Sequence, residues 1–307
     1  MKPVLSIIIL NYNTKNILKD CLASLVRFDK RLDFSGKIIK SNQEEITPAE
    51  IIVVDNGSCD GSREFLKNWE KKKSGFGAIF NKKNLGFGKA NNLAMKKARG
   101  EYFLLLNSDT LFFQAAISQT LFWLCARPEF DLAAPRLLNQ NKTIQPSAGR
   151  FPNLVNTFAM LFLDRLSKKQ ILMSSPDQIK EVDWVMGAFM MLKKKVFTKT
   201  KGFDEKIFMY MEEVEWCYRI KKADFKIGFY PSAQVIHLKG ASSASRTIPI
   251  LNIYKGLIYF YQKHYSKVSY YILKLLLRVK AGLALILGIL TKNEYIKKTY
   301  RQAWAIN

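Results

Sequence analysis

Cysteine and proline are scarce in this sequence, whose 307 residues include four Cys and nine Pro. These numbers exclude a disulfide-dense scaffold and a collagen-like or proline-rich chain. Hydrophobic residues make up 48% of the chain, which supplies a core and excludes wholesale disorder. The cysteines lack the Cys-x-x-Cys spacing of a zinc ribbon, so we interpret them as free thiols in a reducing compartment. They are Cys21, Cys59, Cys125 and Cys217.

Long apolar runs are also missing. The longest uninterrupted run, residues 281–290, has ten residues, whereas a membrane-spanning helix needs about 20. Near the N-terminus, residues 5–10 (LSIIIL) are too few for the apolar core of a signal peptide, and Asn11 and Asn13 follow them directly. We therefore expect a cytoplasmic protein that is not secreted.

Acidic residues are few, because 25 Asp and Glu stand against 49 Lys and Arg, a formal net charge of +24. Such a charge indicates an anionic partner (a nucleic acid, an acidic membrane surface or a phosphorylated substrate) or simply a lysine-rich solvated surface. Residues 241–307 hold eleven basic residues and a single acid, Glu294. This segment predicts a basic amphipathic helix in the interface of an anionic membrane. An ordinary helical subdomain packed on the core is the alternative.

Three short apolar runs, residues 5–10, 51–54 and 102–106, predict buried parallel strands. Thr14 is placed to cap a helix after the first run, and a second helix is expected after Gly88. Strands that alternate with helices are typical of a doubly wound α/β sheet. We expect this domain to span residues 1–240, with a polar insertion at residues 30–50, and a helical segment to follow over residues 241–307.

Polar side chains follow each predicted strand at the point where it ends. In doubly wound sheets, ligands bind outside the carboxyl ends of the strands, so these clusters define one candidate site. They are Asn11-Tyr12-Asn13, Asp55-Asn56-Gly57-Ser58 and Asn107-Ser108-Asp109.

Each cluster suggests a chemistry and also has a simpler interpretation as a turn. Asp55 can accept hydrogen bonds from a base or ribose. The two glycines of residues 84–92 (NLGFGKANN) precede a helix, whose N-terminus favours phosphate. Asp109 can hold Mg²⁺ or Mn²⁺ between the protein and a diphosphate, because these cations prefer oxygen ligands.

Three acids lie close together in an apolar setting, at Glu212, Glu213 and Glu215. On a helix, Glu212 and Glu215 point roughly the same way, whereas Glu213 points elsewhere. A carboxylate beside apolar walls and a second acid gains proton affinity and suits a general base, although a solvated helix N-terminus also favours acids. His237, one of two histidines, is a candidate contact for a metal or phosphate, with a structural role as the alternative.

Five segments in order resemble a family 2 glycosyltransferase with the GT-A fold, and most closely its rhamnosyltransferase-type branch. The match covers residues 4–243. Its segments are VLSIIILNYNT, EIIVVDNGSCDGS, NLGFGKANNLAMKKARGEYFLLLNSDT, DWVMGAFMMLKKKVFTKTKGFDEKIFMYMEEVEWCYRI and AQVIHLKGAS.

The resemblance implies roles for the candidate residues. Asp109 would bind the metal with His237, and Glu213 would be the catalytic base. Asn107 and Glu213 depart from the family, which has Asp at both positions. The residues implied on the nucleotide and donor side are Asn11, Tyr12, Asn13, Asp55, Asn84, Gly86, Asn107, Ser108 and Gly187. Those implied on the acceptor side are Asp204, Glu205 and Glu212. Residues 145–147 and 150–152 resemble a loop on the sugar side.

The resemblance also implies the reaction and its partners. A sugar would move from a nucleotide-diphosphate sugar to a glycan or polyprenyl-linked glycan with inversion, assisted by Mg²⁺ or Mn²⁺. dTDP-rhamnose is the donor that the resemblance favours, and UDP-hexoses stay open. The enzyme would sit on the inner face of the cytoplasmic membrane, and no nucleic-acid partner is expected. The alternatives are a nucleotide-sugar-binding scaffold without catalysis and a basic nucleic-acid-binding protein. A polyprenyl-phosphate sugar transferase shares the fold but usually has spanning helices.

Overall fold

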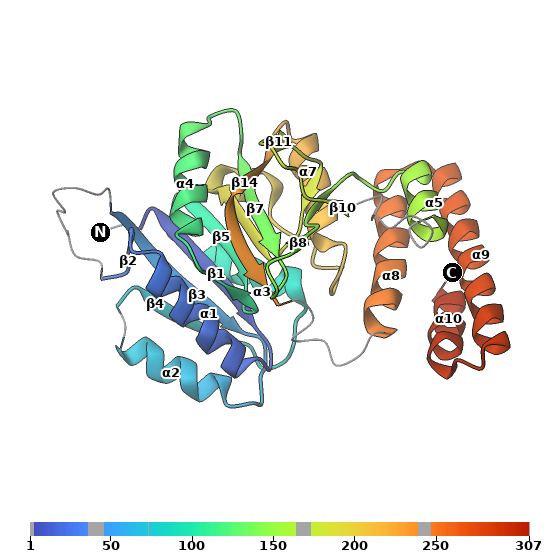
Figure 1. Cartoon of the computed structure of the whole chain (residues 1–307), viewed down its shortest axis with the longest axis horizontal. Helices are drawn as coiled ribbons and strands as arrows, with labels where there is room; N and C mark the ends of the chain where they lie inside the picture. Colours follow the sequence, from blue (N-terminus) through green and yellow to red (C-terminus); the bar gives the residue numbers. More distant parts are fainter. Residues whose placement is uncertain (1–2, 36–45, 73, 164–172, 239–246, 307) are drawn as a thin grey trace.

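The computed structural model describes residues 3–35, 46–72, 74–163, 173–238 and 247–306. It shows a twisted sheet flanked by helices and, beside it, a group of helices formed mainly by the C-terminal part of the chain (Figure 1). The main sheet has the strand order β11-β14-β7-β13-β5-β1-β3-β2, with β4, β6 and β8 paired to its members. The predicted α/β class with a mostly parallel, Rossmann-like sheet is confirmed.

The centre of the sheet is parallel, as the apolar runs predict. β1 pairs with both β3 and β5, and the register places Asn11 beside Asp55 and Leu10 beside Asn107. The polar clusters therefore emerge at one edge of the sheet. The strands of this half are β1 (Leu5–Asn11), β2 (Leu32–Asp33), β3 (Thr47–Asp55), β4 (Phe76–Phe80) and β5 (Tyr102–Asn107).

β3 begins four residues earlier than the apolar run indicates. Glu50 is polar but lies inside the strand, because its buried carboxylate accepts hydrogen bonds from the Ser6 hydroxyl and from Arg99. The final residues of the predicted insertion therefore belong to the sheet, and its middle, residues 36–45, lies outside the described residues.

The second half of the sheet is mixed. β13 runs antiparallel to β5 and β7, whereas β14 runs parallel to β7. A separate small sheet has the order β10-β9-β12. The strands are β6 (Thr110–Leu111), β7 (Leu132–Leu138), β8 (Ile144–Gln145), β9 (Ala148–Gly149), β10 (Met173–Ser174), β11 (Lys180–Glu181), β12 (Trp184–Val185), β13 (Phe189–Lys193) and β14 (Ile227–His237).

Helices cover both faces of the sheet, and each face has its own buried apolar cluster. Alternate residues of β1 separate between them, since Ile8 belongs to one cluster and Ile7 and Ile9 to the other. The helices are α1 (Lys15–Phe28), α2 (Ser62–Lys72), α3 (Phe87–Lys97), α4 (Ala116–Ala126), α6 (Lys194–Thr200) and α7 (Glu212–Lys222).

The C-terminal part is helical, as predicted, and α5 (Leu154–Phe162) packs with it (Figure 1). Its helices are α8 (Thr247–His264), α9 (Lys267–Leu290) and α10 (Glu294–Ile306). Phe260 and Leu277 share a buried cluster with Trp216 of α7, so these helices also pack on the α/β part. Within the described residues, no helix is long and apolar enough to cross a membrane. The predicted domain boundary near residue 240 lies outside the described ranges and stays a prediction.

Candidate active site at the carboxyl ends of the strands

Asn11, at the end of β1, organises the first part of the site. Its fully buried side-chain amide donates to Asp55 Oδ1 and to Ser58 Oγ, each over 3.2 Å. Thr14 donates its hydroxyl to Asn11 Oδ1 over 2.8 Å, so it does not cap α1 with its side chain as expected. Together with a hydrogen bond from the Ser58 N–H, these bonds fix the fully buried Asp55 carboxylate at the end of β3.

The loop after Asn11 is held by hydrogen bonds to Ser58 and Cys59, which follow β3. Asn13 adopts a left-handed backbone with φ of 52° and accepts a hydrogen bond from the Cys59 N–H over 2.8 Å. Its own N–H donates to Ser58 Oγ. Tyr12, between these residues, keeps an exposed ring that is free to stack on a planar ligand.

Asn56 joins this cluster to the loop that carries Asn84 and Gly86. Its amide donates to Asn84 Oδ1 over 2.8 Å and to the Gly86 carbonyl, and its Oδ1 accepts from the Leu85 N–H. The sequence places Asn56 in the second polar cluster of the candidate site but gives it no role of its own. Its role depends on a loop 28 residues later, which the motif does not reveal.

Asp109 and His237 come together as predicted. His237 Nε2 lies 3.2 Å from Asp109 Oδ1 and 3.5 Å from the Asn107 side-chain nitrogen. Asn107 ends β5 and His237 ends β14. Asp109 comes close to His237 because β6, which begins directly after Asp109, pairs with the end of β14. Asp109 and His237 are both almost fully buried, so their donor atoms face the site rather than bulk water.

Gln145 of β8 sets the tautomer of His237. The Gln145 amide nitrogen donates to the His237 carbonyl over 3.2 Å and to Asn139, so Gln145 Oε1 accepts from His237 Nδ1, 2.7 Å away. With a hydrogen on Nδ1, Nε2 turns its lone pair toward the Asp109 carboxylate. Two such acceptors 3.2 Å apart require a proton or a cation between them.

The donor set therefore fits a divalent cation. A carboxylate oxygen and an imidazole nitrogen converge, and the imidazole is oriented by a hydrogen bond on its far side, which is the usual arrangement behind a metal-binding histidine. Among the described residues, no group of three or more His, Cys, Asp or Glu side chains is arranged to hold a metal ion by itself. Diphosphate oxygens would have to supply further ligands, as they do for Mg²⁺ in many phosphate sites.

Glu212 and Glu213 begin α7 across the site from these groups. Two consecutive non-glycine residues, Tyr210 and Met211, have φ of 68° and 74°, and this rare backbone turns the chain into the helix. One carboxylate oxygen of each acid, Oε2, is buried without a hydrogen-bond partner in the described chain. Burial raises the pKa of Glu213 to about 7. Burial and the charge of Glu213 raise the pKa of Glu212 well above its ordinary value.

Gly187 connects the two sides of the site. A Cβ atom at Gly187 would lie 3.0 Å from the Phe87 ring and 4.0 Å from Glu213 Cβ, so a larger residue would crowd the helix start. The next residue, Ala188, accepts the Asn107 N–H over 3.0 Å. Asn107 is therefore linked to Glu213 through two neighbouring residues. Its N–H bonds to Ala188, and Gly187, which precedes Ala188, lies next to Glu213. These contacts bring the start of α7 close to the end of β5, and the donor, metal and base roles of the residues stay predictions.

Glu215 does not share the environment of Glu212, although the helical spacing predicts a common direction. Its fully buried carboxylate accepts from Arg219, Lys263 and His264 over 2.7–3.0 Å. Burial opposes ionisation, but hydrogen bonds from His264 and Arg219 prevail and hold the pKa of Glu215 at about 2. Glu215 therefore fastens α7 to α8 and is not a candidate base.

The remaining predicted residues on the acceptor side lie on the loop before α7. Asp204 accepts from the Tyr259 hydroxyl and from Lys263 of α8, and despite burial these partners lower its pKa to about 2. Glu205 lies 3.5 Å from Lys89 Nζ. The structure gives Asp204 a bridging role toward α8, and a role in acceptor binding stays a prediction for both acids.

Comparisons with known proteins match this chain to glycosyltransferases. A family model described as Glycosyl transferase family 2 matches residues 6–214. The N-acetylglucosaminyl-diphospho-decaprenol L-rhamnosyltransferase of Mycobacterium tuberculosis is 23% identical over 79% of this chain and 78% of that protein. The rhamnosyltransferase WbbL of Escherichia coli is 23% identical over 67% of this chain and 78% of that protein.

A solved structure shares the fold. The mannosyltransferase PcManGT from Pyrobaculum calidifontis, in complex with GDP-Man and Mn²⁺, superimposes with a TM-score of 0.57 at 13% identity. The match covers 100% of this chain and 75% of that one. The similarity therefore extends over the whole GT-A-like architecture.

Proposed function

The chain belongs to glycosyl transferase family 2, and on that premise we propose that it moves a sugar, with inversion, from a nucleotide-diphosphate sugar to a lipid-linked glycan. The family match and the relatives named as glycosyltransferases confirm the expected family and the expected class of enzyme. The relatives that are named rhamnosyltransferases favour a rhamnose donor, and one of them is named for a diphospho-decaprenol acceptor.

The nucleotide half of the donor would lie over the ends of β1 and β3. The fully buried Asp55 carboxylate is held by the Asn11 amide and the Ser58 N–H, and in this proposal one of its oxygens would also accept from the base or ribose. The Asn84–Gly86 loop leads into the N-terminus of α3, where backbone N–H groups and the helix dipole favour negative charge. A diphosphate between this helix and Asp109 would thus meet positive potential on the side opposite the metal ligands.

Asp109 and His237 would hold a divalent cation, Mg²⁺ or Mn²⁺. When bound, such an ion supplies a Lewis acid that neutralises the charge of a departing diphosphate. Gln145 keeps His237 Nε2 available for this purpose, because it occupies the opposite ring nitrogen. Asn107, where the family has Asp, contributes a neutral amide, so Asp109 supplies the carboxylate of this pair.

Glu213 would accept the proton of the acceptor hydroxyl. Its Oε2 atom is buried without a protein partner in the described chain, and a pKa of about 7 suits a base that works near neutral pH. The proton moves from the attacking hydroxyl to Glu213 as the new glycosidic bond forms and the bond to the diphosphate breaks. Asp109 is engaged with His237 and Glu215 with α8, which supports a proposal of direct displacement with inversion in which Glu213 is the base.

The observation that carries this proposal is the oriented Asp109–His237 pair, joined through Asn107 and Gly187 to the orphan carboxylate of Glu213. A panel of nucleotide-sugars with Mg²⁺ or Mn²⁺ tests it, first by thermal shift and then by hydrolysis. We expect one donor to stabilise the protein in the presence of the cation and to be hydrolysed slowly. Binding without hydrolysis or transfer would favour a non-catalytic scaffold, and salt-sensitive DNA binding without donor binding would favour a nucleic-acid-binding protein.

We also propose that the enzyme works at the cytoplasmic face of the cell membrane as a peripheral protein. A polyprenyl-linked acceptor would present its sugar at that surface. The excess of basic residues over residues 241–307 supports attraction to anionic lipid.

A further inference from the structure

Helix α9 turns an apolar face outward. Large hydrophobic side chains along it are exposed, up to 76% for Leu290. They recur every three or four residues and so form one stripe along the 24-residue helix, about 36 Å long. The stripe includes Ile272, Leu275, Val279, Leu283, Ile286 and Leu290. The opposite side of α9 is also apolar, but Leu273, Leu277 and Ala281 bury it against the neighbouring helices.

Helix α5, more than a hundred residues earlier in the chain, widens this face. α5 packs on α9 (Figure 1), and Lys280 of α9 lies 5.6 Å from the ring of Phe162 at the end of α5. On α5, Val155 is 76% exposed and Phe158 is 46% exposed. The exposed sides of α5 and α9 thus form one surface, which we call the α5–α9 face.

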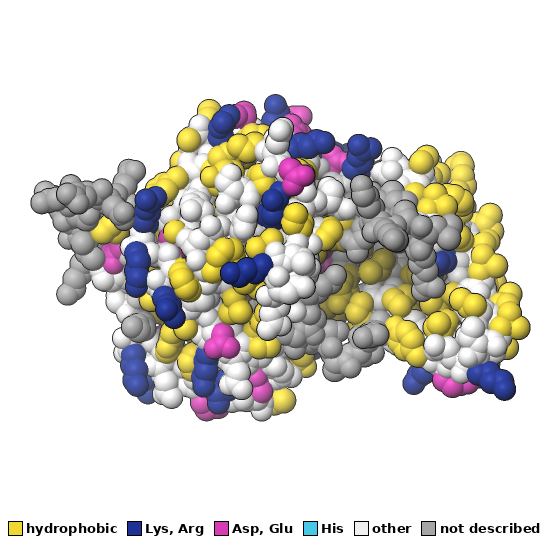
Figure 2. Space-filling model, in the orientation of Figure 1, with side chains coloured by type: hydrophobic (Ala, Val, Ile, Leu, Met, Phe, Trp, Pro, Cys, Tyr) yellow, Lys and Arg dark blue, Asp and Glu magenta, His cyan; other side chains and the backbone are white. Residues whose placement is uncertain are grey.

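The charged residues of α5 and α9 themselves have one sign. The sequences of α5 and α9 contain no Asp or Glu. On α9, the geometry of 100° per residue places Arg278 along one margin of the exposed stripe and Lys280 along the other, where it meets Phe162 of α5. Figure 2 shows hydrophobic side chains gathered over the helices at the right of the view, whereas Lys and Arg are more frequent over the α/β part. Apolar faces with basic margins are typical of helices that lie in a membrane interface.

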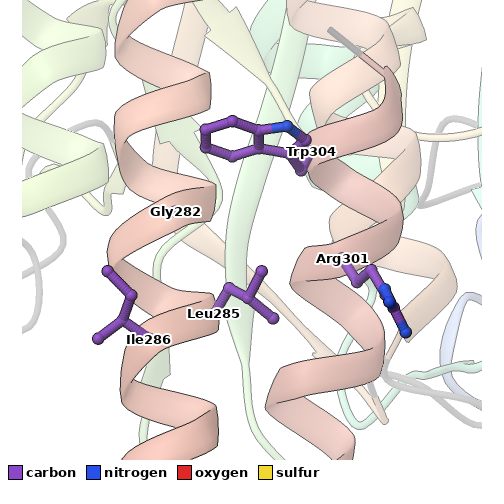
Figure 3. Close-up of a pocket in the computed structure, with 5 residues that line it drawn as sticks. All are labelled: Gly282, Leu285, Ile286, Arg301 and Trp304. Carbon is purple, nitrogen blue, oxygen red and sulfur yellow. The ribbon is translucent and has the colours of Figure 1, made fainter.

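The surface between α9 and α10 is hollowed rather than flat. A cavity of about 350 Å³ lies between Leu285 and Ile286 of α9 and Arg301 and Trp304 of α10 (Figure 3). Gly282 lets the Trp304 ring lie close to α9 at this hollow, since a Cβ there would lie 2.9 Å from the ring. Ile286 lines the hollow and belongs to the stripe. Fluid hydrocarbon chains fill such a hollow readily, whereas a rigid protein partner would need a matching protrusion.

We propose that the α5–α9 face docks on a bilayer that contains anionic phospholipid, with α9 lying in the plane of the interface. The choice of a membrane over a second copy of the chain rests on the proposed function, which requires a membrane-borne acceptor, and on the basic margins. The apolar residues enter the boundary of the acyl chains, and Arg278 and Lys280 remain at the level of the phosphates. The catalytic domain contributes α5 to this surface, so docking is not a property of residues 241–307 alone.

Vesicle co-sedimentation of the full chain tests the proposal with a matched pair of variants. Val279→Glu places a charge on the stripe, and Val26→Glu does the same on α1 of the catalytic domain. Both valines are helical and similarly exposed, 44% and 42%. On vesicles of phosphatidylcholine with phosphatidylglycerol, Val279→Glu and Val155→Glu should each raise the dissociation constant about tenfold or more, while Val26→Glu leaves it nearly unchanged. Equal effects of Val279→Glu and Val26→Glu, or none from either, would overturn the assignment.

Two further measurements separate the alternatives. Sedimentation velocity without lipid should show a monomer, and a dimer that Val279→Glu dissociates, with no vesicle binding, would assign the face to a second copy instead. Hydrolysis of a nucleotide-sugar in lipid-free buffer should be the same for the wild type and Val279→Glu. Vesicle binding without hydrolysis would support the docking face and refute the proposed function. Hydrolysis without vesicle binding would support the proposed function and refute the docking face.

Discussion

Replacing Glu213 with Gln should raise stability and lower activity at once. At high pH the wild-type protein must keep this carboxylate ionised with Oε2 buried and unpartnered. A pKa raised from the ordinary value of 4.5 to about 7 corresponds to a loss of about 3 kcal/mol of stability once Glu213 is fully ionised. Because a buried amide has a smaller cost of its own, Glu213→Gln should gain about 1–3 kcal/mol above pH 7.

The sign and the pH window of this effect follow from the two pKa values. Below pH 4.5 Glu213 is protonated in both the folded and the unfolded state and contributes nothing. Between pH 4.5 and about 7 the folded state binds the extra proton, so the stability of the wild type falls as the pH rises. Glu213→Gln should remove the part of this slope that Glu213 contributes, whereas burial leaves Glu212 a slope of its own. Denaturant titrations at pH 5 and pH 8 measure it, and activity with the same samples should fall about 10²-fold or more.

Glu215→Gln is the matched control on the same helix, and its effect should have the opposite sign. Hydrogen bonds from His264 and Arg219 hold the Glu215 pKa at about 2, so its contribution is fully present above pH 4.5 and disappears as the pH falls toward 2. Glu215→Gln should therefore destabilise the protein by about 3 kcal/mol at neutral pH. A Glu213→Gln variant that is less stable at pH 8, or equally active, would refute the reasoning about the base.

The remaining predictions concern the metal pair and the donor loop. Asp109→Ala should abolish the stabilisation by Mn²⁺ with a nucleoside diphosphate in thermal shift, and equal activity in excess chelator would contradict the assignment. Gln145→Leu removes the acceptor that holds the hydrogen on His237 Nδ1, so the affinity for Mn²⁺ should fall about 10–100-fold by calorimetry. An unchanged affinity would show that Gln145 does not orient the ligand. Gly86→Ala forces a Cβ onto the Phe208 carbonyl oxygen at a φ of 85°. It should cost about 1–3 kcal/mol in denaturant titrations and weaken donor binding, and a neutral result would mean that the loop rearranges freely.

Much of the site could be predicted because it follows from strand ends. Asn11, Asp55 and Asn107 each terminate a buried apolar run, and the parallel pairing of β1 with β3 and β5 brings them to one edge of the sheet. The pairing of Asp109 with His237 was predicted from the resemblance, and the structure provides the reason, since β6 and β14 pair where these residues stand.

What could not be predicted depends on contacts between distant segments. Gln145 reaches His237 across 92 residues of sequence because β8 and β14 both pair with β7. Helical spacing predicts that Glu212 and Glu215 point the same way, but Lys263 and His264 of α8 contact Glu215, whereas Glu212 stays beside Glu213. The packing of α5 on the C-terminal helices likewise has no signal in the local pattern of residues 154–162.

The most direct test of the account is anomalous diffraction from crystals soaked with Mn²⁺ and a nucleoside diphosphate. We predict a manganese peak between Asp109 and His237 Nε2, with the diphosphate oxygens completing the coordination and the nucleoside beside Asp55. A peak elsewhere, or a diphosphate bound away from these residues, would contradict the claim that the donor binds at the carboxyl ends of the strands.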